Sequence, residues 1–414
     1  MTQLEIMGAN AKKAARFLMN AGSEKDVALL AIAKALRENS DKIISANNAD
    51  IENGKKAGLT DSLLDRLRLT EERIEGMADG VEQVAALKDP VGRVLDGSTL
   101  KNGLKIEKVT VPMGVIGIIY EARPNVTSDA AALCLKAGSA VILRGGKEAI
   151  NSNKAIAEVM RNAIEQAGFP ADCVALVEDT SRDSATELMQ LTDYLDVLIP
   201  RGGAGLIKSV VNNAKVPVIE TGVGNCHIYV DDNADIDMAK NIIFNAKTSR
   251  PSVCNAIETV LVHKDIAEKA LPQIKAELDK KNVEIRGCDK TKEILGDCVV
   301  TATEEDYANE FLDYILAVKV VDGLDGALDH IAKYSTGHSE CIITSNYANA
   351  EKFTACVDSA AVYVNASTRF TDGGEFGLGA EIGISTQKLH ARGPMGLNEL
   401  VSSKFIIKGN GQIR

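Results

Sequence analysis

The sequence predicts an α/β protein with a parallel sheet, and three observations support this fold class. From residue 113 onward, short apolar segments alternate with segments of helical spacing, as in repeated β-α-β units. Trp is absent and aromatic residues make up only 4% of the chain, so the core must consist of Ala, Val, Ile and Leu packed in α/β layers. The 414 residues are enough for about two or three domains.

The individual elements follow from the spacing of apolar residues. Residues 1–90 predict helices with starts at Thr60 and Thr70, and residues 103–110 alternate as an exposed strand does. Buried strands separated by helices are expected at 115–120, 140–143, 174–177, 196–199 and 216–219. A second α/β block predicts strands at 226–230, 258–262, 318–321 and 341–343, then Gly-rich loops at 366–396 and a strand at 399–408.

Composition excludes several classes of function. The net charge of −11 opposes nonspecific binding to nucleic acid or to an anionic membrane, although a local cluster of Arg and Lys could still hold an anionic ligand. We see no signal peptide and no apolar run that could span a bilayer. The eight Cys are dispersed without a C-x-x-C motif, and the five His show no metal-ligand spacing. A cytoplasmic protein with reduced thiols and no metal site is therefore expected.

Cys254 is the strongest candidate for a catalytic residue. It lies in a polar turn, residues 248–256, whereas Glu220 follows the apolar segment 216–219. A thiol and a carboxylate that meet across a cleft suit covalent acyl chemistry, with the thiolate as nucleophile and the carboxylate handling protons or water. The alternative is that Cys254 is a small buried apolar residue, as free Cys often is.

Two Gly-rich loops are candidates for anion binding. They are 143–147, which contains Arg144 and Lys147, and 200–205, and each follows an apolar segment and precedes a helix. Main-chain N–H groups at a helix start can bind a phosphate there. Neither loop has the G-x-G-x-x-G pattern, and the alternative is an ordinary turn between strand and helix.

Asn125 lies just after the expected strand 115–120. Its side-chain amide could donate to a developing oxyanion, or it could cap the helix that follows. The sequence leaves both roles open. Glu310 has no distinctive local pattern, and a solvated surface residue is the ordinary interpretation of such a position.

Three stretches, 321–342, 120–127 and 369–379, together resemble the aldehyde dehydrogenase superfamily and most closely its γ-glutamyl phosphate reductase family. The most specific is 321–342, which matches the family pattern through its second His, His338. The resemblance implies a Rossmann-type cofactor domain (1–99 and 113–224), an α/β catalytic domain (225–398) and a small oligomerisation β-arm (100–112 and 399–414). Exposed strand edges tend to be paired, so a homo-oligomer is expected.

The resemblance also implies roles for individual residues. Cys254 falls at the nucleophile and Asn125 at the oxyanion donor, which would act together with the Cys254 main-chain N–H. The implied contacts to the dinucleotide are Arg144, Lys147, Gly202, Gly203 and, at the nicotinamide ribose, Glu310.

The chain departs from the superfamily around Glu220 and Cys254. Thr221–Asn225 stands where Gly-Gly-Lys is usual after the Glu, and 251–253 stands where Gly-Gln is usual before the Cys. The hydrolytic role of Glu220 therefore stays open. The substrate's α-carboxylate needs a cation, for which the candidates are Arg123, Arg250 and Arg369, and surface ion pairing is the alternative for each.

The function that the resemblance implies is NADPH-dependent reduction of L-glutamyl 5-phosphate to L-glutamate 5-semialdehyde, with release of phosphate, through a Cys254 thioester. This would be the second step of proline biosynthesis from glutamate, with glutamate 5-kinase as a candidate partner. Two rivals are an aldehyde dehydrogenase that forms an acid by hydrolysis, and a non-enzymatic protein that retains only the fold. Retention of Cys254, Glu220, Asn125 and Glu310 together argues against the second rival.

Overall fold

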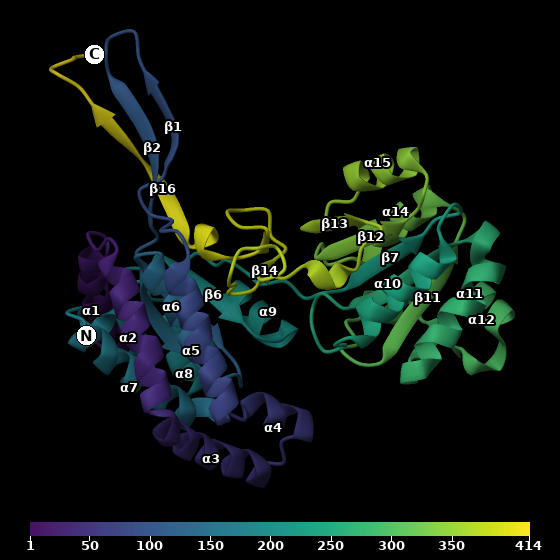
Figure 1. The fold of residues 1–414 in the computed structure, drawn as a ribbon, viewed down its shortest axis with the longest axis horizontal. Coiled ribbons are helices and arrows are strands. Elements are labelled where there is room, and N and C mark those ends of the chain that lie inside the picture. Colours follow the sequence, from purple (N-terminus) through teal and green to yellow (C-terminus); the bar gives the residue numbers. More distant parts are fainter. The chain divides into compact units, whose positions relative to one another are not determined.

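The chain forms two compact units, shown in the computed structural model of Figure 1. The structure describes residues 1–414, except for the side chain of Ser62. The first unit comprises Met1–Glu220, Gly377–Gly383 and Met395–Arg414, and the second comprises Thr221–Phe376 and Ile384–Pro394.

Helices form the N-terminal part of the first unit, as predicted. Thr60 and Thr70 begin the helices α4 and α5, because their hydroxyls accept the main-chain N–H groups of Leu63 and Arg73. The five helices are α1 (Gln3–Leu18), α2 (Glu24–Glu38), α3 (Ser40–Lys56), α4 (Asp61–Leu67) and α5 (Glu71–Ala86).

A parallel four-stranded sheet forms the centre of the first unit. Its order is β5-β4-β3-β6, and its strands are β3 (Val115–Tyr120), β4 (Ala140–Arg144), β5 (Val174–Leu176) and β6 (Val197–Arg201). The connecting helices are α6 (Asn125–Lys136), α7 (Ile150–Gln166) and α8 (Arg182–Met189), and β6 is followed by α9 (Ala204–Asn213). These elements agree with the predicted alternation.

The predicted strand at 216–219 is wrong. This segment makes a single bridge to β6, between Val218 and Leu198. The main-chain bonds of that bridge come from Leu198 N to Pro217 O and from Ile219 N to Leu198 O. Because Pro217 has no N–H, the segment lacks a donor that a longer ladder would need.

An antiparallel sheet of three strands extends away from the helices of the first unit (Figure 1). Its order is β1-β2-β16, with β1 (Val94–Thr99), β2 (Lys105–Pro112) and β16 (Val401–Lys408). The predicted C-terminal strand is thus confirmed. The sheet begins earlier than the expected arm at 100–112, because a turn at Gly103, with φ of +87°, folds β1 back onto β2.

A parallel seven-stranded sheet with order β10-β9-β11-β8-β7-β12-β13 forms the second unit. Its strands are β7 (Cys226–Val230), β8 (Ile257–His263), β9 (Glu284–Gly287), β10 (Val300–Thr301), β11 (Ile315–Val321), β12 (Ser339–Ile343) and β13 (Ala361–Val364). Its helices are α10 (Ile236–Thr248), α11 (Lys264–Leu278), α12 (Asp289–Leu295), α13 (Glu304–Ala308), α14 (Leu324–Tyr334) and α15 (Tyr347–Cys356). The short pair β14 (Ile384–Ser385) and β15 (Gly393–Pro394) forms a separate ribbon.

Apolar side chains cover this sheet in two separate clusters. One cluster joins the sheet to α10 and α11, for example through Ile243 and Leu271. The other joins it to α14 and α15, through Ile331 and Phe353. Helices therefore pack on both faces, as expected for a parallel sheet, and the loops at the strand ends remain available for a site.

Candidate active site

Cys254 lies in the loop between α10 and β8, where the loop before β7 contacts its main chain. Its side chain is half-buried. A Cβ atom on Gly224 would lie 1.6 Å from the Cys254 carbonyl oxygen, and the Cys226 thiol donates to that oxygen at 3.1 Å. Because β7 and β8 are parallel neighbours, the loops before them meet at the amino edge of the sheet. This contact fixes the backbone of the candidate nucleophile.

Glu310 lies before β11 and bonds to the same glycine. Its Oε1 accepts the N–H of Gly224 at 2.8 Å. Burial raises the pKa of Glu310, whereas the Gly224 bond and the Lys247 ammonium act in the opposite direction. Lys247 itself forms a fully buried ion pair with Glu258, with 2.6 Å between Nζ and Oε2. The structure thus brings Glu310 and Cys254 to one loop, and a buried charge pair lies within electrostatic range of Glu310.

Arg369, one of the three predicted substrate arginines, lies within electrostatic range of both Arg250 and Cys254. Arg369 donates from Nε to Ser249 Oγ at 3.0 Å, and its guanidinium also bonds Asn255 Oδ1. Burial lowers the pKa of Arg369, and repulsion by Arg250 lowers it further, while Asp372, the Cys254 thiolate and Glu375 act to raise it. Two positive charges beside a nucleophile suit an anionic substrate.

The predicted anion-binding loops lie at the carboxyl edge of the sheet in the first unit. Arg144 ends β4, and Gly202 and Gly203 follow β6. In the order β5-β4-β3-β6 the chain changes direction at β3, so the loops after β3 and β6 flank a topological switch point. Parallel α/β sheets bind ligands in the crevice at such points.

Glu121, which the sequence did not single out, occupies this switch point. Its Oε2 accepts the N–H of Gly203 at 2.9 Å, at the start of α9. A Cβ atom on Gly202 would lie 2.7 Å from the Glu121 carboxyl carbon, and one on Gly146 would lie 3.5 Å from its main chain. An anionic oxygen therefore fits this helix start, as a phosphate oxygen of a dinucleotide would. The available signal was a charged residue directly after a buried strand.

Arg144 and Lys147 differ in their surroundings. The Arg144 guanidinium donates to the carbonyls of Thr180 and Ser181, at 2.9 and 2.8 Å, and burial lowers its pKa. Lys147, in the same 143–147 loop as Arg144, is exposed. Arg144 therefore fastens the loop after β5, whereas the Lys147 ammonium is accessible to a ligand.

Asn125 opens α6 but does not cap it. The N-cap position is Pro124, which makes no side-chain capping bond, and the Asn125 amide donates to Asp129 Oδ2 at 2.8 Å. The capping alternative is thus wrong, because the amide points to a residue one turn along the helix. Burial raises the pKa of Asp129 to about 6, opposed by this amide bond.

The remaining predicted site residues also lie in the first unit, whereas Cys254 lies in the second. Arg123 and Asn125 follow β3, and Glu220 is the last residue of the unit's longest segment. Each of these side chains is half-buried. Their action on a substrate held at Cys254 remains a prediction.

Gly224 and Cys226 are contacts of Cys254 that sequence reasoning missed. The only local signal was the pair Gly222 and Gly224, two residues apart, directly before the buried strand β7. Residue type alone could not reveal these contacts, because they arise from a close approach of two loops.

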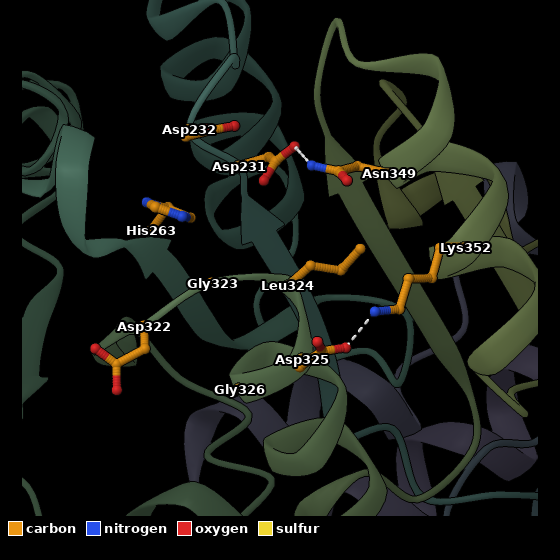
Figure 2. A pocket seen from close by; sticks show the side chains of 10 residues that line it. All are labelled: Asp231, Asp232, His263, Asp322, Gly323, Leu324, Asp325, Gly326, Asn349 and Lys352. Atoms are coloured by element: carbon orange, nitrogen blue, oxygen red, sulfur yellow. Dashed lines mark hydrogen bonds and ion pairs between the residues drawn. The ribbon is translucent and has the colours of Figure 1, made fainter.

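A separate cavity of about 450 Å³ lies at the carboxyl edge of the sheet in the second unit (Figure 2). Asp231, after β7, accepts a bond from Asn349 Nδ2 at 2.7 Å, and Asp325 pairs with Lys352. None of the predicted site residues lines this cavity. Cys254 is at the amino edge of the same sheet, so the cavity is not part of the candidate active site.

Neither a metal site nor a membrane span is found in the described part of the chain. No cluster of three or more His, Cys, Asp or Glu side chains there has an arrangement that could hold a metal ion. Among the described helices, none combines the length and the apolar character needed to cross a bilayer.

Comparison with known proteins gives one consistent family. The model of the aldehyde dehydrogenase family matches residues 2–296. A γ-glutamyl phosphate reductase of Clostridium perfringens (strain 13 / Type A) is 61% identical over 413 residues, covering 100% of this chain and 99% of that protein. The corresponding protein of Clostridium novyi (strain NT) is 61% identical over 405 residues, covering 98% of this chain and 97% of that protein.

Solved structures agree with these relatives. The crystal structure of γ-glutamyl phosphate reductase from Thermotoga maritima matches with a TM-score of 0.98 and 52% identity, and covers 100% of both chains. An acetylating aldehyde dehydrogenase from Geobacillus thermoglucosidasius, at 18% identity and a TM-score of 0.70 over 100% of both chains, shares the fold. The predicted aldehyde dehydrogenase-like fold is therefore confirmed, and the chain belongs to the γ-glutamyl phosphate reductases, oxidoreductases of the aldehyde dehydrogenase family.

Proposed function

We propose that this chain catalyses NADPH-dependent reduction of L-glutamyl 5-phosphate to L-glutamate 5-semialdehyde, with release of phosphate, as the second step of proline biosynthesis. The observation that carries the proposal is a half-buried Cys254 whose loop is contacted by the Arg369 guanidinium, through Ser249 and Asn255. A thiol nucleophile beside two cations suits an anionic acyl donor. Full-length identity of 61% to a protein named γ-glutamyl phosphate reductase supports the same substrate.

The Cys254 thiolate attacks the γ-carbonyl carbon of the acyl phosphate, and the carbon–oxygen bond to phosphate breaks. The product on the protein is a thioester at Cys254. The Asn125 amide and the Cys254 main-chain N–H stabilise the oxyanion formed on the way. Arg250 or Arg369 holds the α-carboxylate through a paired guanidinium contact, which fixes the orientation of the substrate.

NADPH, when bound, would supply the hydride for reduction of the thioester at Cys254. The start of α9, at Gly202 and Gly203, would hold the pyrophosphate, since the Gly203 N–H already donates to a carboxylate oxygen of Glu121. Lys147 and Arg144 favour a cofactor with a 2′-phosphate through their positive charge. Glu310 would contact the nicotinamide ribose, and its carboxylate accepts the N–H of Gly224, which packs against Cys254.

After reduction, the hemithioacetal at Cys254 collapses to the semialdehyde and the free thiolate. No water enters this sequence of steps, and hydrolysis of the thioester would waste the activated substrate. Glu220 is therefore not required as a hydrolytic base, in keeping with the sequence that surrounds it. In the rival reaction, ordinary aldehyde oxidation, Glu220 would activate water.

We further propose that the β1-β2-β16 sheet is an oligomerisation arm of a cytoplasmic homo-oligomer. Its strands β1 and β16 are edge strands, and Val94, Leu95, Phe405 and Ile407 are exposed on them. Exposed edges and apolar side chains are normally covered by a partner. The reactive acyl phosphate would also favour contact with glutamate 5-kinase.

The test is the reverse reaction, NADP⁺ reduction by glutamate 5-semialdehyde with and without inorganic phosphate. The proposal requires steady turnover only when phosphate is present, because phosphate must take the acyl group from Cys254. Equal turnover without phosphate would mean that water resolves the thioester, and would favour the ordinary aldehyde dehydrogenase. NAD⁺ in parallel measures the cofactor preference.

A further inference from the structure

The family-signature stretch 321–342 has no role in the proposed mechanism, yet two of its side chains contact the start of β7. Thr336 Oγ1 accepts the main-chain N–H of Asn225 at 3.0 Å. His338 Nδ1 lies 3.6 Å from Cys226 Sγ. The stretch 321–342 therefore contacts two successive residues, Asn225 and Cys226, at the start of β7.

Asn225 is buried and bonds to residues at the ends of α13 and α14 and to Thr336, which follows α14. Its side chain is 0% exposed. Its Nδ2 donates to the carbonyl of Tyr307 at 2.8 Å, near the end of α13, and to that of Tyr334 at 2.9 Å, at the end of α14. With the Thr336 bond to its main chain, Asn225 is held at three points, so the segment has little freedom to move.

The residues on either side of Asn225 are those that hold Cys254. Gly224 is packed against the Cys254 carbonyl group and donates to Glu310, while Cys226 donates to the Cys254 carbonyl oxygen. A shift of Asn225 must therefore move both contacts of the nucleophile. Among the side chains of 321–342, Thr336 is the one that bonds to the main chain of Asn225.

We propose that Thr336 and Asn225 are positioning residues that set the backbone of Cys254 for attack. The inference rests on the proposed function only in treating Cys254 as the nucleophile. It assigns a structural role to the segment after α14, which is to hold the loop that contains Gly224 in place. Small displacements of a reacting group can cost about a hundredfold in rate.

The decisive variant is Thr336→Val, which keeps the side-chain volume and removes the acceptor for the Asn225 N–H. We expect kcat to fall about tenfold with KM changed less than about twofold, because positioning acts on the chemical step. The rate constant for alkylation of Cys254 by iodoacetamide, followed by peptide mass spectrometry at neutral pH, should change by about threefold or more. Thr336→Ser, which restores the acceptor, should recover both values.

Thr354→Val is the matched control, since Thr354 is an exposed residue of α15 with only local hydroxyl bonds. Its kcat and alkylation rate should equal those of the wild type. The proposal is overturned if folded Thr336→Val protein alkylates and turns over like the wild type, or if Thr336→Ser is as impaired as Thr336→Val. Alkylation needs no substrate, so it still decides the positioning role if the proposed reaction itself fails.

Discussion

Gly224 gives the sharpest test of the candidate site, because its contact with the nucleophile leaves no room for a side chain. In Gly224→Ala, the new Cβ would lie 1.6 Å from the Cys254 carbonyl oxygen and 2.6 Å from the Cys254 Cα. Ordinary contacts between such atoms are about 3.5 Å. The two loops must therefore separate by about 2 Å.

This displacement should lower both the catalytic rate and the stability of the fold. A misplacement of about 1 Å can lower a rate about a hundredfold, so we expect kcat/KM to fall by at least that factor, equivalent to about 2.7 kcal/mol of transition-state stabilisation. Overpacking should lower the free energy of unfolding by about 1–3 kcal/mol. Both quantities are measured on the same preparation, by NADP⁺-linked kinetics with phosphate and by urea unfolding.

Gly76→Ala is the matched control for this variant. Gly76 lies within α5, and a Cβ atom there would meet nothing within 4 Å. Because Ala is the better helix former, the control should be more stable by about 0.5–1 kcal/mol with unchanged kinetics. A folded Gly224→Ala protein with wild-type kcat/KM would refute the reasoning about Cys254.

Three further outcomes are expected. Glu121→Gln should lower the dissociation constant of NADPH about three- to tenfold in a fluorescence titration. The reason is that the cofactor phosphate then no longer has to displace a charged acceptor from the Gly203 N–H. Unchanged or weaker NADPH binding would contradict this prediction. Burial raises the pKa of Asp129 to about 6 in the folded protein, above its ordinary value of about 3.8. The free energy of unfolding should therefore fall as pH rises from about 4 to about 6. Urea unfolding of Asp129→Asn should lack that fall, and an unaltered pH profile would exclude this residue as its cause. Arg369→Lys should raise KM for the semialdehyde about tenfold with a smaller change in kcat, and an unaffected KM would move the carboxylate contact to Arg250.

Local sequence pattern predicts much of the fold because apolar runs are bounded by turn residues. The strands at 115–120 and 226–230 have the predicted bounds, since each is fully buried and preceded by a glycine or a polar turn. The prediction of a strand at 216–219 was wrong, because Pro217 has no N–H to donate to a neighbouring strand. β1 was missed because its six residues are all exposed, which leaves no apolar alternation to detect.

The site was predictable where chemistry depends on residue type. A Cys in a polar loop is a recognisable candidate nucleophile, and Arg is a recognisable candidate for binding a carboxylate. The structure places Cys254, Arg250 and Arg369 in one unit. Gly224 was not predictable, because its requirement comes from a loop that is 30 residues away in sequence and adjacent in space. The placement of Glu121 on Gly203 likewise depends on the strand order, which local pattern does not contain.

The most direct test of the Cys254 thioester is a rapid-mixing measurement without phosphate. Glutamate 5-semialdehyde and NADP⁺ should give a burst of about one NADPH per chain and then stop, with a glutamyl adduct on the Cys254 peptide. Added phosphate should restore turnover, and Cys254→Ala should give neither burst nor adduct. Continuous turnover without phosphate, or a burst that survives in Cys254→Ala, would contradict the account.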